Sequence, residues 1–125
     1  GLAIEIFNEV ISLYNGIYLP NRMYEDWSAA ERERLQIQAL NAYMVLAELI
    51  VDENPRECIR LAQSALMIDN TWEEAYRFQM QAYLQIGNRP QAIKVYKNCV
   101  EVLDREYGID PLPETKRIME IILGK

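Results

Sequence analysis

Histidine is absent from this chain of 125 residues, and cysteine, glycine and proline are scarce, with two, five and five copies. The lack of histidine removes the commonest general base and metal ligand of proteins, which disfavours an enzyme. So little glycine and proline excludes collagen-like and low-complexity chains, and a hydrophobic fraction of 50% excludes intrinsic disorder. We therefore expect residues 1–125 to form one soluble domain.

Long hydrophobic runs are missing as well. No stretch approaches the roughly 20 apolar residues that a membrane span requires. The chain also does not open with the basic, apolar and small-residue segments of a signal peptide. These absences predict a cytoplasmic protein without a membrane partner.

Basic residues are outnumbered by acidic ones, 13 to 19, which gives a net charge of −6. The imbalance is local, because residues 1–88 carry a net charge of −7 and residues 89–125 a net charge of +1. Binding to a phosphate backbone depends on clustered Lys and Arg side chains. We therefore expect this segment to contact proteins and not to bind nucleic acid directly.

The two cysteines, Cys58 and Cys99, lack the C-x-x-C spacing and the histidines of a zinc site. We expect them to be reduced thiols in the core, with a redox or disulfide role as the alternative. The chain also has no glycine-rich phosphate loop, nucleophile elbow or calcium loop. The sequence therefore predicts no catalytic residue, no cofactor and no bound metal.

An internal repeat is the most informative pattern. The segment at 57–66 aligns with the segment at 91–100, so that each residue pairs with the one 34 positions later, as Cys58 does with Ala92. The same offset relates Leu46 to Met80 and Ala65 to Cys99. A period of about 34 with two helices per unit is typical of tetratricopeptide repeats, in which helix pairs stack to bury their apolar faces. We therefore expect an all-α fold, a right-handed stack of antiparallel helix pairs.

Helix boundaries follow from capping residues and glycines. Ser28 with Glu31, and Thr71 with Glu74, match the capping box, and Asn54 precedes a proline suited to a first helical turn. Gly87 is typical of a helix end, as are Gly16 and Gly108. About six helices are expected, over residues 2–14, 28–52, 55–69, 72–87, 89–107 and 113–123.

Paired carboxylates, such as Asp52 with Glu53 and Glu73 with Glu74, could in principle support acid–base catalysis. They fall at expected helix boundaries, however. A negative charge near a helix N-terminus is favoured by the helix dipole. We therefore interpret these carboxylates as capping groups.

The concave face of stacked helix pairs is where ligands usually bind, and the first helix of each unit lines it. In the 34-residue register, Leu40, Tyr43, Ala47 and Ile50 of one unit correspond to Glu74, Arg77, Gln81 and Leu84 of the next. We expect the apolar set to be covered by residues 1–24. The polar residues Glu74, Arg77 and Gln81 are the candidates for a partner-binding groove, and a merely solvated helix face is the alternative.

Several motifs together resemble a known family. They are Leu13-Tyr14-Asn15-Gly16-Ile17-Tyr18-Leu19-Pro20 near the start, Tyr24-Glu25-Asp26-Trp27 and Glu31-Arg32-Glu33-Arg34-Leu35 before and within the second helix, and Glu106-Tyr107-Gly108-Ile109-Asp110-Pro111 with Pro113-Glu114-Thr115 near the end. This combination is similar to the bacterial transcriptional activator domain of the antibiotic regulatory protein type of transcription factor. Asn54-Pro55 and Asn70 depart from the family pattern, yet both still suit helix boundaries.

The resemblance implies a non-catalytic module that normally follows a winged-helix DNA-binding module, so we expect this chain to be a fragment of a larger regulator. It also implies protein partners: the DNA-binding module itself, a second copy in a homodimer, or the transcription machinery. The alternative is a tetratricopeptide adaptor, unrelated to transcription, that binds a peptide segment in its groove.

Overall fold

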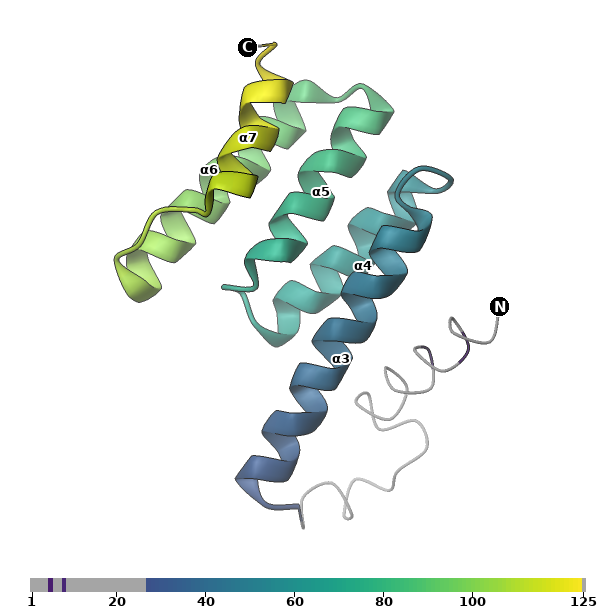
Figure 1. Ribbon diagram of the computed structural model, residues 1–125, viewed down its shortest axis with the longest axis vertical. Helices are drawn as coiled ribbons and strands as arrows, with labels where there is room; N and C mark the ends of the chain where they lie inside the picture. The colour runs from purple at the N-terminus through teal and green to yellow at the C-terminus, as the bar shows by residue number, and fades with distance from the viewer. Residues whose placement is uncertain (1–4, 6–7, 9–26, 125) are drawn as a thin grey trace.

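The computed structural model describes residue 5, residue 8 and residues 27–124, and within them all regular structure is helical (Figure 1). None of the helices in this part of the chain is long and apolar enough to cross a bilayer. Of the helix expected at 2–14, Glu5 and Asn8 are described, and both are helical. The rest of that helix lies outside the described residues. The five other expected helices are present, as α3 (Ala29–Ile50), α4 (Pro55–Ile68), α5 (Glu73–Ile86), α6 (Arg89–Tyr107) and α7 (Pro113–Ile122).

Consecutive helices run in opposite directions and pack against one another along the chain. Figure 1 shows α3, α5 and α7 running in the same direction, with α4 and α6 returning behind them. The three parallel helices also contact one another, because α5 packs against both α3 and α7. The helix α5 therefore lies at the centre of the described part, between the first helix pair and the C-terminal helix.

Side-chain caps begin three of the helices. Ser28 accepts a hydrogen bond from the amide of Glu31, at 3.1 Å, and Asn54 and Asn88 cap α4 and α6 in the same way. The cap predicted at Thr71 is wrong. Trp72 precedes α5 without a side-chain cap, and the hydroxyl and amide of Thr71 donate instead to the carboxylate of Asp69. The carboxylate of Asp69 therefore stabilises the turn between α4 and α5 by accepting both hydrogen bonds.

Left-handed backbone ends two helices at glycine, as the sequence predicts. Gly87 follows α5 with a φ of 86°, and Gly108 follows α6 with a φ of 64°. Residues with a Cβ atom rarely adopt this conformation. The amides of both glycines donate to carbonyls of the last turn and so complete the helix ends.

Three repeat-related pairs are buried alike in the core. Leu46 and Met80 are both buried, and Cys58 and its counterpart Ala92 are fully covered. Ala65 and Cys99 are also fully covered, which confirms that the cysteines are buried, and both thiols are free. Small residues at these points allow helices to approach closely. At these three pairs the 34-residue offset relates residues with the same role in packing.

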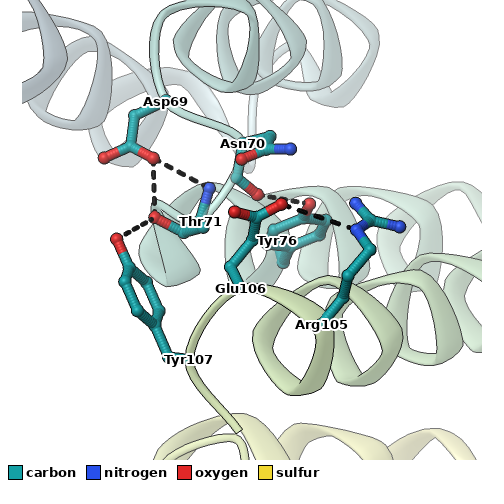
Figure 2. A network of polar contacts seen from close by, with 7 residues as sticks. All are labelled: Asp69, Asn70, Thr71, Tyr76, Arg105, Glu106 and Tyr107. Carbon is teal, nitrogen blue, oxygen red and sulfur yellow. Dashed lines mark hydrogen bonds and ion pairs between the residues drawn. The ribbon is translucent and has the colours of Figure 1, made fainter. Parts of the chain in front are cut away.

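A polar network joins the turn between α4 and α5 to the end of α6 (Figure 2). The hydroxyl of Tyr76 donates to the carbonyl of Asn70 at 2.7 Å. The hydroxyls of Thr71 and Tyr107 lie 3.4 Å apart, so that the last turn of α6 reaches the turn before α5. These contacts fix the N-terminal end of α5, which carries the residues discussed next.

Candidate interaction groove

A groove of about 750 Å³ lies between the C-terminal end of α3 and the second half of α5. Glu48, Val51 and Asp52 line it from α3 and the turn that follows, while four residues of α5 line its other side. Those four residues recur at helical spacing, which brings them to one face of α5, and they are Phe78, Gln81, Leu84 and Gln85. The groove therefore combines apolar, amide and carboxylate groups.

One hydrogen bond crosses the groove. The amide Nε2 of Gln85 donates to Oδ1 of Asp52 at 2.7 Å. Among the residues that the structure describes, the lining holds two carboxylates, Glu48 and Asp52, and no Lys or Arg side chain. Phe78 also packs against the core of α3 and α4, so the apolar part of the groove is continuous with the rigid core.

The three candidate residues occupy different places. Gln81 lines the groove. Glu74 and Arg77 are not part of its lining, and both are half-buried near the start of α5. Their counterparts in the preceding unit, Leu40, Tyr43 and Ala47, are all buried. Residues 1–24, which were expected to cover them, lie outside the described residues apart from Glu5 and Asn8. The helices named by the repeat are thus those that form the groove, but the lining residues lie nearer the C-terminal ends of both helices than predicted.

Arg77 belongs to a separate polar cluster between α5 and α7. Its Nη1 lies 3.7 Å from Oε2 of Glu73 and donates to the hydroxyl of Thr115 at 3.2 Å. Thr115 in turn donates to Oε2 of Glu73, and the amide of Leu112 donates to the same oxygen at 2.7 Å. Thr115 is fully buried. We call Glu73, Arg77, Leu112 and Thr115 the α7 clamp.

The clamp brings a carboxylate from α5 to the N-terminal end of α7, which has no capping side chain of its own. Leu112 precedes α7 and cannot cap it with a side chain. The carboxylate of Glu73 accepts from the amide of Leu112 itself and from the hydroxyl of Thr115, and so brings a negative charge to the N-terminal end of α7, where the helix dipole favours one. At the opposite end of α7, Arg89 Nε donates to the carbonyl of Ile122 at 2.8 Å. Charges from α5 and α6 therefore complement both ends of this ten-residue helix.

Both cysteine thiols of the described part are buried and unactivated. Burial raises the pKa of the Cys58 thiol to about 11 and that of the Cys99 thiol to about 12. A thiol must ionise to act as a nucleophile or a metal ligand. Within residues 27–124, Cys, Asp and Glu side chains nowhere gather in a group of three that could bind a metal ion.

The model of one protein family, the bacterial transcriptional activator domain, matches residues 1–123. The chain belongs to this family. No curated protein and no solved structure matches it. The match covers nearly the whole chain and confirms the resemblance noted in the sequence. The chain is thus a module of a bacterial transcription regulator, and its family is a regulatory one and not a known enzyme family.

The α7 clamp gives a structural role to the final motif of this bacterial transcriptional activator domain. Thr115 of the Pro113-Glu114-Thr115 motif is the residue that reaches Glu73. Pro113 occupies the first position of α7, where a missing amide hydrogen has no cost. Sequence reasoning found the motif and interpreted Glu73 as a cap. It did not predict that Glu73 contacts α7. The available signal was Leu112, which precedes Pro113 and has no side chain that could cap α7.

Proposed function

We propose that this domain is a non-catalytic interaction module whose groove between α3 and α5 receives a segment of a protein partner. That groove is the observation that carries the proposal. It is formed by the helices that the 34-residue register relates to each other, and Phe78 gives it an apolar base supported by the core. In a tetratricopeptide-like right-handed stack these helices line the concave face.

We also propose that the partner is a protein. It is the regulator's own winged-helix DNA-binding module, a second copy in a homodimer, or the transcription machinery. The net charge of −6 supports a division of labour in which another module of the same cytoplasmic regulator binds DNA. Binding at the groove would then change activation by shifting the regulator between docked and free states. Of the residues selected from the sequence, Gln81 is retained as a groove contact, while Glu74 and Arg77 lie nearer the start of α5, outside the groove lining.

A single bulky substitution tests the proposal in the full-length product of the gene. Gln81→Trp places an indole in the groove, and Gln63→Trp, at an exposed position on α4, is the matched control. We expect Gln81→Trp to lower promoter activation about tenfold, which corresponds to about 1.4 kcal/mol of lost binding. The control is expected to activate normally. Circular dichroism confirms that both variants are folded, and normal activation by folded Gln81→Trp would overturn the proposal.

A further inference from the structure

The C-terminal end of α3 carries a charge that opposes its own helix dipole. Glu48 lies in the last turn, which contains no basic residue. The dipole places partial negative charge at this end, so the carboxylate of Glu48 is destabilising there. Asp52 and Glu53 lie in the turn between α3 and α4, where the N-terminal end of α4 favours negative charge.

Within residues 27–124, no ion pair includes Glu48, Asp52 or Glu53. Asp52 accepts a hydrogen bond from the neutral amide of Gln85. Local conflicts that a protein leaves uncompensated are concentrated at functional sites. Here the conflict lies at the edge of the groove, because Glu48 and Asp52 line it.

The other side chains that line the groove can contact the apolar stem of a cationic side chain and the residues next to it. Phe78 and Leu84 offer apolar surface, and the amide groups of Gln81 and Gln85 can both donate and accept hydrogen bonds. A volume of about 750 Å³ falls in the range of roughly 300–1,000 Å³ found for pockets that bury most of a small ligand. The groove can therefore hold a few side chains of a polypeptide.

We propose that the groove selects a partner segment with a Lys or Arg residue beside an apolar one, the cation meeting Glu48 and Asp52 and the apolar side chain packing on Phe78 and Leu84. This inference rests on the proposed function and adds the chemistry of the partner. The incoming cation pairs with both carboxylates, which are exposed in the free domain, and complements the end of α3. A charge-assisted hydrogen bond is stronger than a neutral one.

The experiment uses the 125-residue chain and a phage-displayed library of random 12-residue peptides. Parallel selections are made on the wild type, on Glu48→Gln/Asp52→Asn, and on the control Glu101→Gln/Asp104→Asn. The control removes two exposed carboxylates from α6, outside the groove. The peptide most enriched on the wild type is then labelled with fluorescein, and its affinity for each variant is measured by fluorescence anisotropy.

We expect the enriched peptides to contain Lys or Arg next to Leu, Ile, Phe or Trp. Glu48→Gln/Asp52→Asn should weaken binding about fivefold to tenfold, the sum expected for two partly exposed charge pairs. The control should bind as the wild type does, and added salt should weaken the wild type more than the groove variant. Enrichment of acidic or uncharged peptides, or equal affinity in all three proteins, overturns the inference.

Thermal unfolding supplies a second readout that a merely structural role would not give. Glu48→Gln alone should raise the unfolding midpoint by roughly 1–2 °C because it removes a negative charge from the C-terminal end of α3. A lower midpoint would show that this carboxylate supports the free domain and would overturn the inference.

The variant Gln81→Trp separates the two levels of the proposal. If it blocks peptide binding while the charge variant does not, the selectivity for cations is wrong and the groove remains the interaction site. If neither variant affects the selected peptide, both proposals fail. Sedimentation that shows a dimer abolished by Gln81→Trp assigns the groove to a second copy and also overturns the inference.

Discussion

The buried hydroxyl of Thr115, in α7, donates a hydrogen bond to the carboxylate of Glu73, 42 residues earlier, at the start of α5. The same oxygen of Glu73 accepts the amide of Leu112, and Arg77 approaches both Glu73 and Thr115. The side chain of Glu73 is 12% exposed, so water replaces these partners poorly. The first turn of α7 is thus attached to the middle of the helix stack by one carboxylate.

Thr115→Val tests this attachment at nearly constant volume. The variant removes the hydroxyl and leaves a largely buried carboxylate with one donor fewer. We expect the free energy of unfolding to fall by about 1.5–3 kcal/mol, the range for hydrogen bonds to charged groups. Urea denaturation followed by circular dichroism measures the change. Thr115→Ser retains the hydroxyl and should lose only about 1 kcal/mol, for one buried methyl group, so an equal loss in both variants would contradict the role of the hydrogen bond.

Two adjacent glutamates provide a second, internally controlled comparison. Glu73→Gln removes the negative charge at the N-terminus of α7, whereas Glu74→Gln changes a side chain outside the clamp. We expect Glu73→Gln to lower stability by about 1–2 kcal/mol and Glu74→Gln to stay within about 0.5 kcal/mol of the wild type. Urea midpoints report both effects. Similar values for the two variants would argue that the carboxylate of Glu73 contributes nothing specific.

The sequence predicted the helices well because their signals are local. Asn54 and Gly108 act on the backbone within a few residues, and the expected and observed limits of the described helices differ by two residues or fewer. The cap expected at Thr71 failed because α5 begins one residue later, after Trp72, and the hydroxyl and amide of Thr71 donate to Asp69.

The site was less predictable, because it depends on which residues far apart in the chain meet. Glu73 and Glu74 have the same chemistry, and nothing local says that the first one reaches α7. Arg77 was selected as a groove residue, yet its guanidinium faces Thr115 across a sequence separation of 38 residues. Gln81 lies in the groove because it is one turn further along α5, opposite the end of α3. Periodicity in the sequence predicts which face of a helix is turned towards the groove. The tilt of the neighbouring helices decides which part of that face stays open to solvent.

Gly87 offers a test of a purely conformational contribution. A Cβ atom at this position would meet no other atom within 4 Å, so a substitution adds no clash. Its φ of 86° nevertheless disfavours any residue with a Cβ. We expect Gly87→Ala to lower the free energy of unfolding by about 1–2 kcal/mol. Gly87→Asn should cost less, because Asn tolerates the left-handed region better, and the reverse order in urea denaturation would contradict this explanation.

The raised pKa values of the two cysteines predict slow thiol chemistry. Both thiols are fully covered, and desolvation raises their pKa values to about 11 and 12 for Cys58 and Cys99. At pH 8 the reaction with Ellman's reagent should therefore proceed at the rate of opening or unfolding of the protein. In 6 M guanidinium both thiols should react at once. A fast reaction of either thiol in the native protein would show that its surroundings open readily.

Two buried groups, the phenol of Tyr76 and the thiol of Cys99, should lower the stability of the fold at alkaline pH. Tyr76 is buried, which raises its pKa from 10.0 to about 12, and the pKa of Cys99 rises from 9.0 to about 12. Above pH 9 the unfolded chain therefore loses protons that the folded chain retains, so the free energy of unfolding must fall as pH rises towards 12. Each group that titrates only when unfolded adds a slope of up to about 1.4 kcal/mol per pH unit. Urea denaturation between pH 8 and 10.5 measures the decline.

The variant Tyr76→Phe isolates the share of the tyrosine in this decline. It removes one of the titrating groups and should flatten the curve above pH 10, where the phenol of the unfolded chain ionises. It also lowers stability at pH 8 by about 1 kcal/mol, because the hydrogen bond to the carbonyl of Asn70 is lost. The slope, and not the offset, is therefore the informative quantity. An unchanged slope in this variant would mean that Tyr76 ionises equally in both states.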